Sequence, residues 1–361
     1  MNNLNDFAKE INKCSKCGLC QSVCPLYKLT GNDCAVSKGK FVMLDGVVKG
    51  DLRLNKTINK YLDMCLKCGK CSDFCPSGIN VCEIFASAKH EYLKSAFEGL
   101  LVKAIYSKFM FDFGLKIFDT FHKNDNSILK SVSEKSILFF RGCADKIYSA
   151  DEKAFKTVIS NLPYQIFEPD FKCCGVPFVS SGYLEKAEYA KKYNTQKINS
   201  SDCDLVVTDC ASCQYSLESY GTLNKRVLSS VEFFAEEHIK FEFDKKYRVT
   251  FHKPCHLKNY DAVKEVLANC KNVEYVEMEG FDDCCGFSGQ FAITNQKLSR
   301  DISRQKIEKA LAVEPDIILT SCPACILGLY QGLFASKGIV NTPKIMNITA
   351  FLGMAQLVLK K

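Results

Sequence analysis

Short apolar runs alternate with longer amphipathic stretches over the C-terminal part of the chain. Tyr183–Asn199 and Lys297–Ala312 have the length and composition of helices. The runs that predict buried strands are Ser136–Arg141, Tyr164–Phe167, Asp204–Thr208, Arg248–His252, Val273–Val276 and Asp316–Thr320. Strands that alternate with helices normally form parallel sheets with crossover helices, so the pattern predicts an α/β fold.

The first 96 residues predict a helical domain instead. Lys40–Val48 is compatible with a helix, and Ile79–Ala96 carries apolar residues at helical spacing. Residues 97–122 interleave Phe and Leu with Lys and predict an amphipathic helical pair, within a segment that extends to residue 133. We interpret this segment as a linker that packs on its neighbours. The alternative is a surface for the membrane face or for a partner subunit.

The C-terminal part is an internal duplication. Corresponding cysteines lie 111 or 112 residues apart: Cys143 with Cys255, Cys173 with Cys284, and Cys210 with Cys322. The expected domains are therefore a helical domain at 1–96, the linker at 97–133, a first repeat at 134–235 and a second at 245–361. Because each cysteine group follows a predicted strand, we expect the cysteines of a repeat to converge at the carboxyl edge of its sheet.

Composition narrows the class of protein. The chain has 361 residues, is 47% hydrophobic, carries a formal net charge of +7 and contains 22 cysteines. It has no apolar stretch near 18 residues and no basic block interleaved with aromatics, so neither a transmembrane segment nor a nucleic-acid partner is predicted. The first residues lack the apolar region of a signal peptide. We therefore expect a cytoplasmic protein, with any contact to the inner face of the membrane made peripherally through partners.

Two cysteine runs near the N-terminus share the spacing C-x-x-C-x-x-C-x-x-x-C-P. They are Cys14, Cys17, Cys20 and Cys24 before Pro25, and Cys65, Cys68, Cys71 and Cys75 before Pro76. Cytoplasmic thiols stay reduced, which favours metal ligands over disulfides. In two-cluster ferredoxins the fourth cysteine of each run ligates the other cluster.

We therefore expect two cubane [4Fe-4S] clusters. One would use Cys14, Cys17, Cys20 and Cys75, and the other Cys65, Cys68, Cys71 and Cys24. Zinc fits these runs less well because it usually takes four ligands in two pairs.

Each C-terminal repeat carries five further candidate metal ligands. The two sets are Cys143, Cys173, Cys174, Cys210 and Cys213, and Cys255, Cys284, Cys285, Cys322 and Cys325. Zinc bound by four of the five sulfurs is one alternative, and a redox-active disulfide within a Cys-Cys pair is another. Gly175 and Gly286 follow the pairs, which is consistent with a close approach of the backbone to a bulky inorganic ligand.

These patterns, C-x(29)-CCG-x(34)-CxxC and C-x(28)-CCG-x(35)-CxxC, resemble the CCG domains of the heterodisulfide reductase B subunit. Placed behind two ferredoxin-type runs, they resemble the D subunit of that enzyme. The iron-sulfur subunits of glycolate oxidase, lactate utilisation and anaerobic glycerol-3-phosphate dehydrogenase complexes are similar too. The resemblance covers about residues 10–330. It implies that the five-cysteine sets hold one or two additional, non-cubane [4Fe-4S] clusters.

The resemblance implies an oxidoreductase subunit in electron transport. A flavin-containing dehydrogenase subunit would oxidise glycolate, lactate or glycerol 3-phosphate, and this chain would pass the electrons towards quinone or another membrane-bound acceptor. The alternative is a heterodisulfide-reductase-like subunit that reduces a disulfide or a quinone at a non-cubane cluster. A zinc-stabilised interaction module is the non-redox alternative.

Other residues give weaker indications. The sequence contains no nucleotide- or flavin-binding motif and no recognisable acid, base or nucleophile set, so no catalytic or organic-cofactor-binding residue is named. His252 and His256 flank Cys255 and either tune a cluster, donate protons or hold the neighbouring loop by hydrogen bonds. The remaining thiols are expected to be buried and structural: Cys34, Cys82, Cys203 and Cys270.

Overall fold

The computed structural model describes residues 3–95, 135–143, 149–336 and 342–358, and it is a mixed α/β protein, as predicted. The chain forms two compact units. One unit contains the N-terminal described residues together with Pro177–Ala187 and Ser288–Leu298. The other contains the rest of both repeats. The predicted linker at 97–133 lies outside the described residues.

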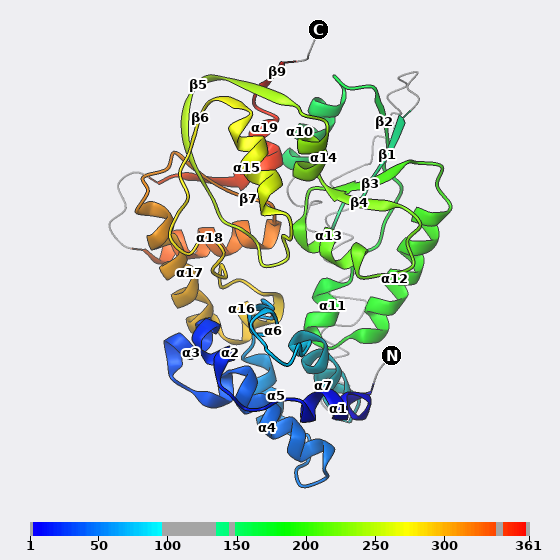
Figure 1. The fold of residues 1–361 in the computed structure, drawn as a ribbon, viewed down its shortest axis with the longest axis vertical. Helices are drawn as coiled ribbons and strands as arrows, with labels where there is room; N and C mark the ends of the chain where they lie inside the picture. Colours follow the sequence, from blue (N-terminus) through cyan, green and yellow to red (C-terminus); the bar gives the residue numbers. More distant parts are fainter. Residues whose placement is uncertain (1–2, 96–134, 144–148, 337–341, 359–361) are drawn as a thin grey trace. The chain divides into compact units, whose positions relative to one another are not determined.

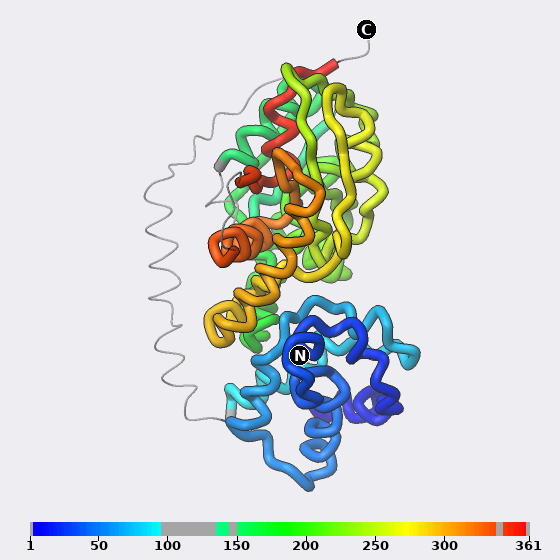
Figure 2. Tube along the Cα trace, turned by 90° about the vertical axis from the view of Figure 1, so that its left-hand side faces the viewer, coloured from blue at the N-terminus to red at the C-terminus, as the bar shows by residue number. Residues whose placement is uncertain are grey.

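The first unit is built from helices, which appear as the blue to cyan bundle in Figure 2. Its core includes Leu44, Leu62 and Phe85, each with no exposed surface. Cys14 and Cys65 are half-buried against this core. Its elements are η1 (Leu4–Phe7), α1 (Ala8–Asn12), α2 (Leu19–Val23), α3 (Pro25–Thr30), η2 (Asp33–Ala35), α4 (Ser37–Val48), α5 (Lys56–Asp63), α6 (Lys70–Asp73) and α7 (Val81–Ser95).

Two segments from the C-terminal repeats complete this helical unit. They contain α11 (Val176–Ser181) and α16 (Gly289–Thr294), each of which begins within a few residues of a Cys-Cys pair. The buried Lys89 on α7 lies 2.5 Å from Asp63 and donates to Gln290 at 2.5 Å. His90 Nδ1 lies 2.9 Å from the carbonyl oxygen of Gly182. The sequence of each repeat is therefore interrupted by a short piece that packs with the ferredoxin-type runs.

The second unit holds two sheets, each with parallel strands, which appear green and yellow to red in Figure 1. Their strand orders are β2-β1-β3-β4 and β6-β5-β7-β8, and β9 adds an antiparallel pair to β5. The elements of the first repeat are β1 (Lys135–Phe139), α10 (Ser149–Ile159), β2 (Tyr164–Phe167), α12 (Leu184–Asn199), β3 (Leu205–Thr208), α13 (Ala211–Glu218), β4 (Arg226–Ser229) and α14 (Ser230–Glu236). Those of the second are β5 (Lys240–Phe251), α15 (Tyr260–Ala268), β6 (Cys270–Tyr275), α17 (Gln296–Leu311), β7 (Ile317–Thr320), α18 (Pro323–Ala335), β8 (Lys344–Asn347), α19 (Ile348–Leu352) and β9 (Gln356–Val358).

All of the predicted strands are present, but each repeat has a fourth strand that the sequence pattern did not predict. These are β4 and β8, which are short edge strands with two or fewer neighbouring apolar residues. Each pairs in parallel with the strand that precedes a C-x-x-C group. A short strand at a sheet edge needs little apolar character of its own, because its backbone pairs on one side only.

The hydrogen-bond register shows that the repeats are structurally equivalent. The N–H of Phe140 donates to Val207 and that of His252 donates to Leu319, both at 2.8 Å. Phe140 and His252 therefore occupy the same position, one residue beyond β1 and β5. Both residues are fully buried.

The two repeats pack on each other as a pseudo-two-fold pair within one unit. α10 packs on α19, and α14 packs on α15. In the first repeat α10 and α14 occupy the positions that α15 and α19 occupy in the second. Exchanging the repeats therefore converts one contact into the other, as at a two-fold interface. Ser230 and Thr349 begin equivalent helices and lie 2.6 Å apart through their hydroxyls. A Cβ on Gly353 would clash with the Cβ of Ala154, so this packing requires glycine.

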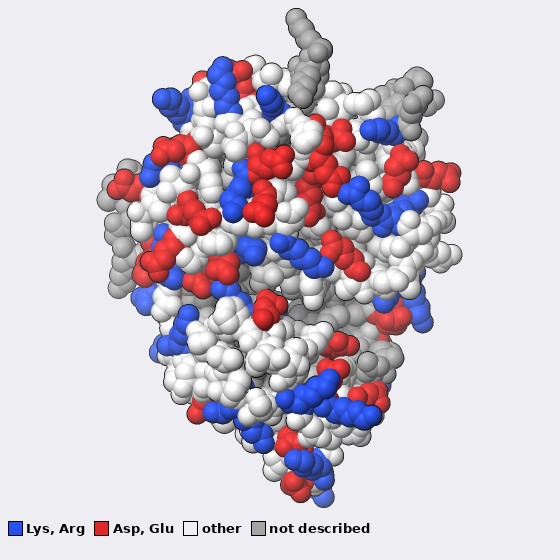
Figure 3. Space-filling view, viewed as in Figure 1, with Lys and Arg blue, Asp and Glu red and all other residues white. Residues whose placement is uncertain are grey.

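The described helices bear on the expected absence of a membrane span, and one face of the molecule shows how the charged side chains are distributed (Figure 3). Among the described residues, no helix combines the length and apolar character needed to cross a bilayer. Lys and Arg side chains are interspersed with Asp and Glu on the face drawn in Figure 3.

Candidate metal centres

The two ferredoxin-type runs fold into the same loop. Lys16 and Gly18 have φ values of 58° and 87°, and the equivalent Lys67 and Gly69 have 55° and 78°. Left-handed residues on both sides of the second cysteine curl the backbone, so that all three cysteines of a loop can face one side. Each loop then enters a short helix, α2 or α6.

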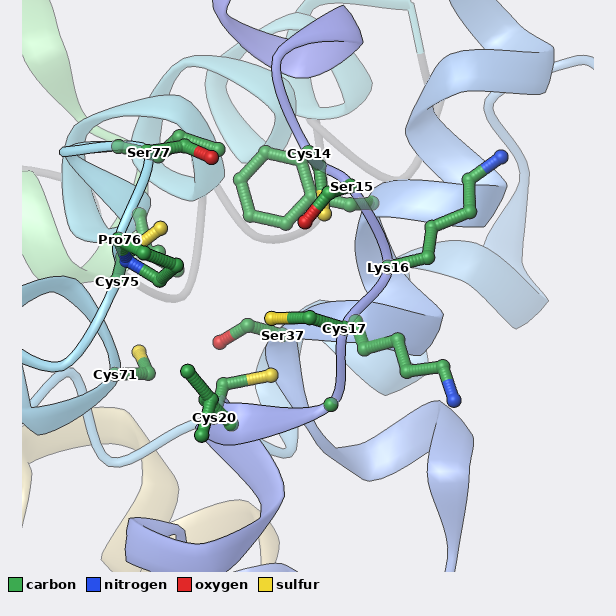
Figure 4. A pocket seen from close by; sticks show the side chains of 16 residues that line it. Cys14, Ser15, Lys16, Cys17, Cys20, Ser37, Cys71, Cys75, Pro76 and Ser77 are labelled. Carbon is green, nitrogen blue, oxygen red and sulfur yellow. The ribbon is translucent and has the colours of Figure 1, made fainter.

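A pocket in the first unit brings together cysteines from both runs. Five cysteines line it: Cys14, Cys17, Cys20, Cys71 and Cys75. Figure 4 shows the sulfurs pointing into the same space. Cys75 comes from the second run, as the expected exchange of fourth ligands requires, but Cys71 of the same run lines the pocket too.

The remaining cysteines of the two runs lie near Cys65. Burial and the neighbouring charge of Cys65 raise the pKa values of Cys24 and Cys71. They also raise the pKa of Cys82 to about 11, so a thiol outside both motifs lies beside this group. Clustered thiols that resist ionisation are suited to a bound cation, which stabilises the thiolate form.

Lys40 is the charged residue that sequence reasoning missed. Its side chain is 1% exposed, and Nζ donates to the carbonyl oxygens of Ala35 at 2.6 Å and Met64 at 2.7 Å. Burial lowers the pKa of Lys40, and the thiols of Cys65 and Cys24 oppose that shift. A lysine within an ordinary helical pattern carries no sequence signal for this placement.

We expect Lys40→Met to lower the midpoint potential of the cluster at the Cys65 group. A buried positive charge stabilises the reduced, more negative state, so its removal makes reduction harder. The measurement is a redox titration followed by EPR. Lys49→Met is the control, since Lys49 is exposed and pairs with Asp45 at 2.8 Å. An unchanged potential in Lys40→Met would contradict this role.

The five cysteines of the first repeat converge, as predicted. Cys143 Sγ lies 3.4 Å from Cys173 Sγ. Hydrogen bonds with Cys173 and Cys213 lower the pKa of Cys174 to about 5. Contacts with Cys174 and Cys210 raise the pKa of Cys213. The set therefore forms a continuous series of neighbouring sulfurs, and each of the five is present as a thiol.

The second repeat gathers four of its cysteines in the same way. Cys285 Sγ lies 3.4 Å from Cys325 Sγ. Hydrogen bonds with Cys284 and Cys325 lower the pKa of Cys285. Cys322 and Cys325 also contact each other. Cys255 is exposed, whereas its counterpart in the first repeat is half-buried.

The two five-cysteine sets meet at the interface between the repeats. Hydrogen bonding to Cys210 lowers the pKa of its counterpart Cys322. Ser212 Oγ lies 3.7 Å from Cys322 Sγ. The Ala211 N–H donates to the carbonyl of Ser321 at 2.8 Å. The sequence predicted convergence within each repeat but gave no sign that the two sets adjoin.

The helices that follow the C-x-x-C groups favour negative charge at these positions. Cys210 and Cys322 are the N-caps of α13 and α18, and Pro323 occupies the first turn of α18. The exposed N–H groups and the dipole at a helix N-terminus stabilise a thiolate.

Hydrogen bonds fix the backbone behind the Cys-Cys pairs. Ser216 and Tyr220 donate to the carbonyl of Cys174 at 2.6 and 2.9 Å, and Ser303 donates to that of Cys285 at 2.7 Å. A Cβ on Gly286 would lie 2.7 Å from the carbonyl oxygen of Ser299. The close approach that requires this glycine is therefore made by helix α17.

Family models identify both parts of the chain. A 4Fe-4S dicluster domain matches residues 10–79. A cysteine-rich domain, CCG, matches residues 137–218 and again 249–330. The matched ranges contain the candidate ligand cysteines described above. Converging thiols and these matches together indicate iron-sulfur clusters.

Several curated proteins are similar over most of their length. The B subunit of the CoM/CoB fumarate reductase of Methanothermobacter marburgensis is 27% identical, over 96% of this chain and 73% of that protein. The D subunit of the dihydromethanophenazine:CoB–CoM heterodisulfide reductase of Methanosarcina acetivorans is 24% identical, over 94% and 93%. A probable glycolate oxidase iron-sulfur subunit of Bacillus subtilis is 22% identical, over 90% and 89%.

A solved structure shares the fold. It is described as a hypothetical protein from Helicobacter pylori, with a TM-score of 0.54 and 10% identity, over 87% of this chain and 67% of that one. The chain thus combines a 4Fe-4S dicluster domain with two cysteine-rich CCG domains and is similar to iron-sulfur subunits of oxidoreductases.

Proposed function

We propose that this chain is the electron-transfer subunit of a respiratory dehydrogenase complex. A flavin-containing partner subunit oxidises a 2-hydroxy acid of the glycolate or lactate type, or glycerol 3-phosphate. The chain receives single electrons from this partner and delivers them towards quinone or another membrane-bound acceptor. It works in the cytoplasm, at the inner face of the membrane through its partners.

The observation that carries this proposal is the placement of cysteines from both ferredoxin-type runs around one pocket. On this basis Cys14, Cys17, Cys20 and Cys75 hold one cubane cluster, and Cys65, Cys68, Cys71 and Cys24 hold another. Such clusters supply one-electron storage at a potential set by burial, charge and hydrogen bonds to sulfur. The two five-cysteine sets hold one or two further clusters of the non-cubane type.

A second candidate function rests on the interface between the repeats. The contact of Cys210 with Cys322 joins a cysteine of the first set to its counterpart in the second. Such a paired site is suited to a substrate that accepts two electrons, such as a disulfide or a quinone. Disulfide or quinone reduction on this chain is therefore the alternative, and the heterodisulfide reductase relative is consistent with it.

Metal content tests the number of clusters. We expect anaerobically purified protein to contain roughly 16 iron atoms, because each of four clusters holds four. A value near eight would leave the CCG sites without clusters, and stoichiometric zinc in place of iron would contradict the redox function.

EPR then distinguishes the two functions. In the electron-transfer subunit, adding a disulfide or a quinone analogue to the oxidised protein leaves the spectrum unchanged. A paramagnetic signal that appears only with one of these substrates would instead assign catalysis to the CCG sites.

A further inference from the structure

The two CCG sites carry different residues at an equivalent buried position next to their cysteines. Phe140 in the first repeat and His252 in the second make the same backbone hydrogen bond and follow equivalent strands. Both side chains have no exposed surface. The chain therefore contains a natural comparison between an apolar ring and an imidazole at one position of the same site.

His252 faces the thiols of its own repeat. A ring nitrogen of His252 and the sulfurs of Cys285 and Cys325 all lie within 4.8 Å of one another. Among the described residues, neither ring nitrogen has an oxygen or nitrogen partner at hydrogen-bond distance. Burial lowers the pKa of His252, and its contact with Cys285 opposes that shift.

The buried imidazole of His252 has an N–H group that requires a hydrogen-bond acceptor. Even the neutral ring carries one N–H, and a buried donor without an acceptor costs about 1–3 kcal/mol. The sulfur of Cys285 is the acceptor that the surroundings offer. A thiolate there accepts a stronger hydrogen bond than a neutral thiol, because it carries charge.

We propose that His252 donates its ring N–H to the sulfur of Cys285 and thereby gives the second CCG site a higher reduction potential than the first. The inference rests on the proposed function, since it requires a cluster at each CCG site. A hydrogen bond to a ligand sulfur stabilises the added negative charge of the reduced state. Phe140 offers no such donor, so electrons collect at the second site. His252 thus does not bind iron itself and acts on the site only through its hydrogen bond to Cys285.

The test compares full-length proteins prepared anaerobically: wild type, His252→Phe, His252→Gln and Phe140→His. Cys285→Ser identifies the EPR signal of the second site, because it removes a ligand there. Iron content is measured first, then midpoint potentials by EPR, and then couplings to exchangeable deuterons by pulsed EPR in D₂O.

The expected result is specific to one signal. His252→Phe keeps its iron, lowers the midpoint potential of the second-site signal and loses an exchangeable deuteron coupling, while the other signals stay unchanged. His252→Gln retains an N–H donor and lies between wild type and His252→Phe. Phe140→His raises the potential of the first site.

Three results would overturn the inference. One is a His252→Phe protein that keeps its iron and its wild-type potentials. Another is a strong ¹⁴N coupling in wild type, which would make His252 a direct iron ligand. The third is loss of the second-site signal in both His252→Phe and His252→Gln. A wild-type protein with about eight irons would instead show that the CCG sites hold no clusters. Iron content therefore tests that part of the proposed function before any variant is compared.

Discussion

Replacing Cys75 with alanine should remove about four of the roughly 16 iron atoms, because alanine leaves one cubane cluster without its fourth ligand. Cys75 belongs to the second ferredoxin-type run by sequence but lines the pocket of the first. The lost EPR signal should therefore be the one that Cys14→Ala also removes. Iron analysis and EPR of the reduced proteins measure both effects.

Double variants decide which cluster Cys75 serves. Cys14→Ala with Cys75→Ala should lose no more iron than either single variant, because both act on one cluster. Cys65→Ala with Cys75→Ala should lose about eight iron atoms, because two clusters are affected. The reverse outcome would show that each run ligates its own cluster. Cys34→Ala is the control, since Cys34 lies outside both motifs, and it should keep all of the iron.

Lys89→Ala should lower the free energy of unfolding by about 3–5 kcal/mol, the usual cost of leaving a buried charge without its partner. Lys89 is 3% exposed and lies 2.5 Å from Asp63, and it also donates to Gln290. The substitution leaves the Asp63 carboxylate without its charged partner. It also removes the hydrogen bond between α7 and Gln290, in the segment after the second Cys-Cys pair. Chemical denaturation of the anaerobic protein, followed by circular dichroism, measures the loss.

Two further variants make this prediction specific. Lys94→Ala should cost less than about 1 kcal/mol, because the pair of Lys94 with Glu185 is exposed on both sides. Lys89→Met with Asp63→Leu should recover most of the stability, since buried ion pairs are often replaceable by apolar residues. Equal losses for Lys89→Ala and Lys94→Ala would show that burial of the pair does not determine its contribution.

The sequence predicted the parts of this protein that depend on local pattern. Strand and helix positions followed from runs such as Tyr164–Phe167, which is β2 residue for residue. Cysteine spacing and the constant offset between repeats predicted which thiols converge within a repeat. These features are encoded locally, because parallel strands bring residues that follow them to one edge of the sheet.

The sequence did not predict the edge strands β4 and β8, because their formation depends on contacts with distant segments. They are four residues long, and their pairing depends on a neighbour that the chain supplies elsewhere. The close approach of helix α17 to Gly286 was not predicted either. Contacts between segments distant in sequence leave no periodic pattern.

The sequence alone predicted iron-sulfur clusters and named the candidate ligand cysteines, because ligand type and spacing are local properties. Only the tertiary structure placed Lys40 and His252 beside those thiols and Cys210 against Cys322. A buried charge or imidazole acts on a cluster through distance and desolvation. Both quantities arise when distant segments pack together, which is why the potentials of these sites are a property of the fold.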